Sequence, residues 1–402
     1  MSTASQIEAQ PYESALYGVT GRIIFCIFIL TSAVSVLGIS VVVLTGTLAG
    51  VHDFTSYWAA GQQLIRGANP YSESAVSVLE RSHGYKGTDM ILIMRNPPSA
   101  LFLVIPLGLT GARAGSILWS LLSLGCLAAS IRMIWRMNGS PPGRLHLLGY
   151  LFVPVLLCFA TGQIGIILLL GLALFLRLHD SKPWLAGMAL SLCALKPHLF
   201  LPFAVALFVW IVTRKAYRIL VGAALALGVC CVIPLFFDPS VWTQYIQMAR
   251  KSGIENEFMV DLGTLLRFAL DRQAIWLQFL PAALACVWAL WYFQRHRMDW
   301  DWQTHGSLLM IVSVLAAPYS WFTDQAVLMP ALLHGLYSGK SQVALLGLTS
   351  VALFEMLFSG VNQHSVPLFW AYCWPAIAWL AWYLWPMGSG LGSTSLPKEI
   401  EP

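Results

Sequence analysis

An aspartate followed by two aromatic residues stands where the first long apolar segment of the chain ends. The stretch from His52 to Gly61 reads His-Asp-Phe-Thr-Ser-Tyr-Trp-Ala-Ala-Gly, with Asp53 close in sequence to Tyr57 and Trp58. A charged group at membrane depth is costly, whereas tyrosine and tryptophan favour the interface. The pattern indicates a base beside a lipid-borne substrate. A plain interfacial anchor, with Asp53 as the helix cap, is the alternative.

Two further breaks between apolar runs carry groups suited to a phosphorylated sugar. Arg95 and Asn96 precede a Pro-Pro pair, and the forked donors of an arginine can hold two phosphate oxygens. Snorkelling to the interface is the alternative for this arginine. Gln163 interrupts two short apolar runs, where its amide can bond a hydroxyl or cap a helix junction.

The most informative break is Lys196-Pro-His198, where a lysine and a histidine flank a proline far from the other basic clusters. A lone lysine at outer membrane depth is costly unless it meets an anion or water, so anion binding is favoured over snorkelling. A last loop between apolar spans carries Trp321 and Asp324. Its aromatic residues are typical of an interface belt, but a carboxylate beside an apolar span needs water or a partner.

These groups together suit a polyprenyl-phosphate sugar, with cations for the phosphate, rings and amides for the sugar, and a base for the acceptor hydroxyl. A transporter or flippase of a lipid-linked sugar would use the same cations and rings without a base. A membrane scaffold without a small-molecule site is the third alternative. Replacing Asp53 separates the first two, since only the enzyme needs a base.

The composition is that of a multi-spanning membrane protein. Of 402 residues, 58% are hydrophobic and 10% are charged, whereas soluble domains carry about 25% charged residues. The formal charge of +5 does not indicate nucleic-acid binding, because the basic residues form short clusters between apolar spans. The eight cysteines lie in apolar spans without a Cys-x-x-Cys pair, so neither a disulfide framework nor a metal site is expected.

Assigning the basic clusters to the cytoplasmic side gives a single topology. It predicts a cytoplasmic tail over 1–20, a transmembrane domain over 21–387 and a cytoplasmic tail over 388–402, with outer segments at about 50–113 and 238–272. Lipid-facing backbone must satisfy its own hydrogen bonds, so we expect an all-α polytopic fold with about twelve transmembrane or re-entrant helices. The first spans are expected at 23–48, 114–135, 145–160, 164–178, 184–195, 199–213 and 219–237.

Six short motifs in this order resemble glycosyltransferase family 87. They are Asp-Phe-x-x-Tyr-Trp-x-Ala-Gly, Gly-x-x-Pro-Tyr, Asn-Pro-Pro, Gly-Gln, Leu-Lys-Pro and Pro-x-Ser-Trp, between Asp53 and Pro330. The resemblance implies a GT-C-type membrane glycosyltransferase related to polyprenyl-phosphate-mannose-dependent mannosyltransferases. It implies Asp53 as the catalytic base, Tyr57 as the family's aromatic position and Lys196 as a donor-phosphate residue. Several relatives carry two histidines where this chain has Thr323 and Asp324, so that histidine role does not carry over.

The resulting expectation is a direct displacement on the outer face of a bacterial inner membrane. Asp53 accepts a proton from the acceptor hydroxyl of a glycolipid or glycan, the hydroxyl attacks the anomeric carbon, and the lipid phosphate leaves with inversion. Arg95, Lys196 or both stabilise the phosphate as it leaves. No cofactor is expected, and a metal is not required. A metal-dependent variant using Asp53 and Asp324 is the alternative.

Overall fold

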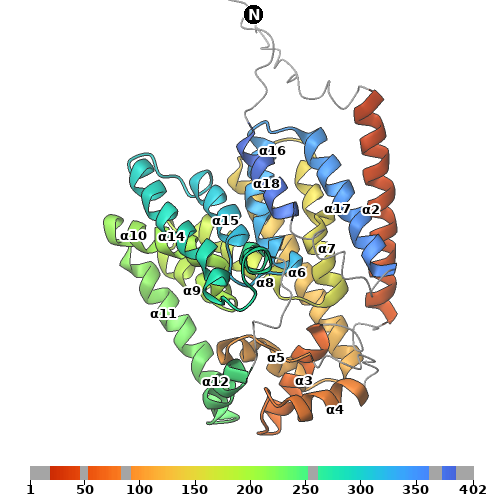
Figure 1. The fold of residues 1–402 in the computed structure, drawn as a ribbon, viewed down its shortest axis with the longest axis vertical. Helices are drawn as coiled ribbons and strands as arrows, with labels where there is room; N and C mark the ends of the chain where they lie inside the picture. The colour runs from red at the N-terminus through yellow and green to blue at the C-terminus, as the bar shows by residue number, and fades with distance from the viewer. Residues whose placement is uncertain (1–18, 46–52, 83–91, 252–260, 362–373, 386–402) are drawn as a thin grey trace, which may run out of the picture.

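The computed structural model describes residues 19–45, 53–82, 92–251, 261–361 and 374–385, and throughout these the regular structure is helical, without a strand (Figure 1). The all-α prediction is therefore confirmed, as expected where lipid leaves no other partner for the backbone. The predicted tails lie outside the described residues except for Val19 and Thr20.

Five helical stretches are long and apolar enough to cross a membrane, since a crossing takes roughly 17–25 residues. They lie in α2 (Val19–Thr45), α6 (Ala112–Met137), η4 with α10 (Pro197–Phe200 and Leu201–Arg214), α11 with η5 (Tyr217–Val232 and Ile233–Phe236) and α14 (Trp276–His296). Further apolar helices complete the bundle. They are α7 (Val153–Thr161), which follows η3 (Leu145–Leu151), then α8 (Gly165–Leu178), α9 (Pro183–Cys193), α15 (His305–Leu315), α16 (Met329–Tyr337), α17 (Gln342–Val361) and α18 (Trp374–Leu384).

Helix α8 forms the centre of this bundle. It is apolar along nearly its whole length, buried on most of its surface, and it contacts α6, α9 and η7 (Phe322–Leu328). A helix that is hydrophobic all round belongs in the interior of a bundle. The segments that lead into α8 and α10 therefore meet in the interior instead of at the lipid-facing surface.

The helices of the first predicted outer segment lie at one end of the molecule, together with the helix Val241–Lys251 of the second (Figure 1). The first contains α3 (Asp53–Ile65), α4 (Glu73–Ser82), η2 (Pro98–Ala100) and α5 (Leu101–Gly108), and the second contains α12 (Val241–Lys251) and α13 (Leu262–Ala269). The rings of Tyr71 and Tyr245 join them, with centroids 5.4 Å apart. The eight-residue α5 is too short to cross a bilayer.

Helix α3 is buried more completely than its sequence indicates. Its apolar spacing predicts an amphipathic helix with one buried face, yet nearly every residue from Phe54 to Leu64 is buried. Small residues explain the difference, because Gly61 lies directly against Gly108 of α5. A Cβ atom on Gly61 would overlap the carbonyl oxygen of Val104. Helix α5 therefore covers the face of α3 that carries Gly61.

We expect Gly61→Ala to lower the stability of the folded protein by about 1–3 kcal/mol, because the added methyl group forces α3 and α5 apart. The melting temperature in detergent measures the effect. The matched control is Gly125→Ala in α6, where an added Cβ meets no atom within 4 Å. An equal loss in both variants would show that the close packing at Gly61 has no special weight.

Candidate functional site

A buried ion pair joins two of the sequence breaks. Lys196 Nζ lies 2.6 Å from Asp324 Oδ1, and the two side chains are 7% and 0% exposed. Lys196 stands at the junction of α9 and η4, whereas Asp324 belongs to η7, 128 residues further along the chain. Both charged groups are therefore shielded from solvent. Removal of either partner leaves an uncompensated charge in the interior.

The ion pair continues into a chain of hydrogen bonds. Gln163 Oε1 accepts from Lys196 Nζ at 3.3 Å and from the Tyr57 hydroxyl at 3.2 Å. On the other side, Asp324 Oδ2 accepts from the backbone N–H of Trp321 at 3.0 Å. Five sequence-predicted site residues, from α3, the α7–α8 junction, the α9–η4 junction and the start of η7, therefore form one connected network.

Tyr57 belongs to the same helix as Asp53, four residues further along α3. Its ring is buried and lies 5.7 Å from that of Trp119. Burial, and then the negative charges of Asp53 and Asp324, raise the pKa of Tyr57 well above its usual value. The hydroxyl therefore stays protonated and donates its hydrogen to Gln163.

Asp53 is the first residue of α3 and is half-buried. A carboxylate is stabilised in the first turn of a helix, where the backbone dipole is positive. The negative charge of Asp53 contributes to the raised pKa of Tyr57, four residues further along α3. A partly solvated carboxylate at the start of the helix that carries Tyr57 can accept a proton from a group that enters from outside.

A left-handed glycine holds α3 against Gln163. Gly162 ends α7 with φ of 76°, and its carbonyl accepts from Trp119 Nε1 at 2.7 Å. A Cβ atom at this position would overlap Phe54, the residue after Asp53. The Gly-Gln motif therefore fixes the distance between the helix of Asp53 and the amide of Gln163.

Trp58 and Asn96 are buried, and each donates a hydrogen bond to a backbone carbonyl. Trp58 Nε1 donates to the carbonyl of Thr110 at 3.0 Å, which ties α3 to the start of α6. Asn96 Nδ2 donates to the carbonyl of Leu195 at 3.0 Å, directly before Lys196. Arg95 is exposed, in contrast to its neighbour. The structure thus brings Asn96 to the lysine loop and leaves Arg95 at the surface.

An aromatic group lies beside the ion pair. The His198 ring packs edge-on against Tyr319, with centroids 5.4 Å apart, and Trp321 Nε1 donates to the Tyr319 hydroxyl at 3.1 Å. Trp321 is 39% exposed. His198 Nε2 is buried and has no hydrogen-bond partner among the described residues, as is also true of Thr323 Oγ1. Buried polar atoms normally have a partner, so these two can serve a ligand.

A second buried network was missed by the sequence reasoning. Gln278 Nε2 donates to Asp261 Oδ1 at 2.8 Å and to the carbonyl of Pro318 at 2.7 Å. Arg267 Nη1 donates to Gln278 Oε1 at 3.1 Å. Gln278 thereby fixes the start of the loop that leads to Trp321 and Asp324. An amide inside an otherwise apolar helix was the available signal.

Asp261 gives this network a pH dependence. Burial raises its pKa to about 6, against hydrogen bonds from Thr264 and Gln278 that lower it. An unfolded aspartate titrates at about 3.9, so the contribution of Asp261 is most favourable below that pH and is lost as pH rises through about 6.

The variant Asp261→Asn keeps an acceptor at the start of α13 and removes this charge. We expect its melting temperature to exceed that of the parent at pH about 7.5, with the difference shrinking toward pH about 5. Thermal unfolding of both proteins across this range measures the effect. A difference that does not change with pH would contradict the assignment.

Metal-ligating residue types meet at one place in the described part of the chain. His296, Asp299 and His305, between α14 and α15, hold their ligand-type atoms within 4.8 Å of one another. His305 Nδ1 already accepts from the backbone N–H of Asp301 at 3.1 Å. In the candidate site, Asp324 Oδ1 accepts from Lys196 and Oδ2 accepts from the backbone N–H of Trp321. The variant with a metal between Asp53 and Asp324 stays a prediction.

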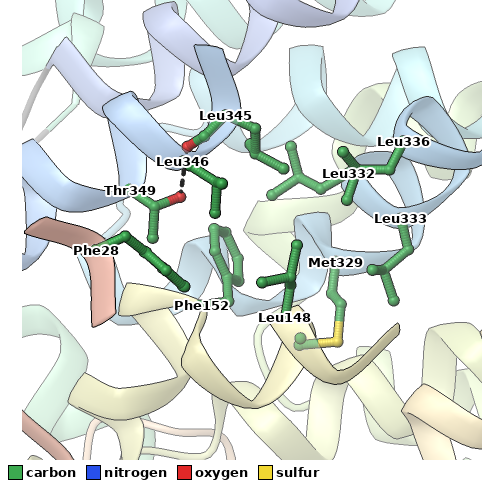
Figure 2. A pocket seen from close by; sticks show the side chains of 11 residues that line it. Phe28, Leu148, Phe152, Met329, Leu332, Leu333, Leu336, Leu345, Leu346 and Thr349 are labelled. Carbon is green, nitrogen blue, oxygen red and sulfur yellow. Dashed lines mark hydrogen bonds between the residues drawn. The ribbon is translucent and has the colours of Figure 1, made fainter. Parts of the chain in front are cut away.

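An apolar cavity between α2, η3, α16 and α17 is separate from the ion pair (Figure 2). Its volume is about 30 Å³. Thr349 lines it, but its hydroxyl donates to the carbonyl of Leu345 at 2.8 Å, within α17. The remaining side chains that line it are hydrocarbon or thioether, such as Phe28, Phe152 and Met329. The cavity therefore offers no group for sugar chemistry.

Comparison with known proteins gives one match. The family model of glycosyltransferase family 87 matches residues 95–318, more than half of the chain. No curated protein and no solved structure matches. Five predicted site residues lie inside the matched range, namely Arg95, Asn96, Gln163, Lys196 and His198. The other five lie outside it, namely Asp53, Tyr57, Trp58, Trp321 and Asp324.

Proposed function

Since this chain belongs to glycosyltransferase family 87, we propose that it transfers a hexose, with mannose as the first candidate, from a polyprenyl-phosphate sugar to an acceptor hydroxyl. The acceptor is a glycolipid or a glycan. In the proposal, a GT-C-type domain over 21–387 works on the outer face of the inner membrane. That orientation is supported by the basic clusters at the other helix ends.

One observation carries the proposal. Asp53 begins the helix that carries Tyr57, and the Tyr57 hydroxyl and Lys196 Nζ both donate to Gln163 Oε1. A base and a cation at one site are what a displacement at a glycosyl phosphate requires. A flippase needs the cation but has no use for the base.

In the proposed step, the oxygen of the acceptor hydroxyl forms a bond to the anomeric carbon as its proton passes to Asp53. The bond between the anomeric carbon and the phosphate oxygen breaks, and its electron pair leaves with the lipid phosphate. Attack from the opposite side inverts the configuration. Holding donor and acceptor together supplies much of the rate.

In the proposal, Lys196 donates a hydrogen bond to the leaving phosphate while it stays paired with Asp324. An ammonium group has three donors, and Asp324 and Gln163 accept two of them. The third donor is available to a phosphate oxygen on which negative charge develops. Arg95, which is exposed one residue before the buried Asn96, is the second candidate cation.

The test is incubation of the purified protein with labelled polyprenyl-phosphate mannose, glucose or arabinose and a membrane extract as acceptor. Transfer from one donor, with an inverted linkage in the product, is the expected result. Movement of a labelled lipid-linked sugar across proteoliposomes, without transfer from any donor, would instead support the flippase.

A further inference from the structure

A polar cavity of about 680 Å³ lies at the ends of α9 and α10 that are far from Lys196. Helix α9 begins at this cavity and ends before Lys196, whereas α10 begins after Lys196 and ends at the cavity. Three connections line it. They contribute His179 and Asp180 from the α8–α9 turn, Arg214, Lys215 and Arg218 around the α10–α11 turn, and Trp300, Asp301 and Trp302 before α15.

The cations of the cavity are less compensated than its carboxylates. Asp180 pairs with His179 at 3.1 Å, and Asp301 Oδ2 accepts the backbone N–H of Thr304 at 2.8 Å. By contrast, none of the three cations around the α10–α11 turn forms an ion pair within the described residues. The positive-inside rule predicts basic loops, but it does not require three cations at one cavity.

Lys215 occupies a backbone position that favours glycine. It follows α10 with φ of 55° and ψ of 32°, in the left-handed region where a side chain is disfavoured. Helices commonly end on glycine at such a position. A lysine there keeps a positive charge at the cavity despite the local strain.

Tryptophan side chains form the apolar part of the cavity wall. Trp302 lies against Trp210 and Trp300, with ring centroids 5.6 Å and 5.3 Å away. The indole N–H groups of Trp300 and Trp302 have no acceptor among the described residues. Tryptophan is enriched at the depth of lipid headgroups, where one side of the ring is apolar and the N–H meets polar groups.

We propose that this cavity binds a phosphate group, either in the headgroup of an anionic phospholipid or as free phosphate. Basic pockets between helices on the cytoplasmic side recognise anionic headgroups, and arginine forks fit phosphate oxygens. The N-terminus of α11, at Tyr217, adds its positive dipole end beside Arg218. This site is independent of sugar transfer, because it lies at the other end of α9 and α10.

The test uses the purified full-length protein in a neutral detergent and follows tryptophan fluorescence. Dioctanoyl phosphatidylglycerol, dioctanoyl phosphatidylcholine and inorganic phosphate are titrated separately. We expect saturable binding of phosphatidylglycerol, at least tenfold tighter than that of phosphatidylcholine. The variant R214Q/K215Q/R218Q should bind at least tenfold more weakly, whereas the matched variant R132Q/R136Q/R144Q, from another basic cluster, should stay within about twofold.

A single variant separates binding from folding. Lys215→Gly removes one cation and places glycine at a left-handed residue, so we expect weaker binding with a melting temperature equal to or above that of the parent. Inorganic phosphate that competes with phosphatidylglycerol would identify free phosphate as a ligand, and its failure to compete would identify the lipid. Absence of binding by both, or equal losses in the two triple variants, would overturn the proposal.

Discussion

Asp53→Asn is expected to lower the rate of sugar transfer by about 10²–10⁴-fold, the usual contribution of a general base. Asparagine is similar in size and keeps the polar start of α3, but it cannot accept the proton of the acceptor hydroxyl. The close contact of α3 with α5 lies at Gly61 and Gly108, about two helical turns from Asp53, so we expect the fold and donor binding to be retained. Initial rates with the labelled donor, together with a donor-binding titration, measure the two effects separately.

Asp271→Asn is the matched control, because Asp271 is an exposed aspartate in the second outer segment. It should transfer sugar at the parental rate. A high rate in Asp53→Asn would exclude this carboxylate as the base. Retained transport of a lipid-linked sugar in Asp53→Asn, with no transfer in the parent, would favour the flippase.

The positions of the helices could be predicted from the sequence because the apolar runs are bounded by clear breaks. The predicted span 164–178 corresponds to α8, and 184–195 corresponds to α9. Consecutive helices run in opposite directions, so every second break lies at the same side of the bundle. Gln163 and Lys196 are at two such breaks, and they lie within hydrogen-bonding distance.

The partners of these residues could not be predicted, because they are far away in the sequence. Nothing near Lys196 indicates that its counter-ion is Asp324. The local sequence indicates that a buried lysine needs a counter-ion. Which carboxylate supplies it depends on the packing of α8 against η7. The same limit applies to Gln278, which bonds Pro318 across 40 residues. The burial of α3 was also missed, because Gly61 gains its meaning only from Gly108.

The second large effect is expected on folding, from separate removal of the two charges of the buried ion pair. Lys196→Met leaves Asp324 fully buried without its cation, and Asp324→Asn leaves the ammonium without its anion. Loss of one partner of a buried pair costs about 3–5 kcal/mol, because the remaining charge is unpaired in the interior. The melting temperatures of both variants should fall strongly. Asp180→Asn, which alters an aspartate 84% exposed, should change stability little.

The double variant Lys196→Met/Asp324→Asn then separates the structural role of the pair from its proposed role in transfer. Because neither charge remains, we expect its stability to exceed that of both single variants, as coupling within a double-mutant cycle predicts. Its transfer activity should nevertheless stay low, since no lysine donor remains for the leaving phosphate. Recovery of activity together with stability would mean that Lys196 serves only the fold. Stability losses that simply add would show that the two side chains do not interact in the folded protein.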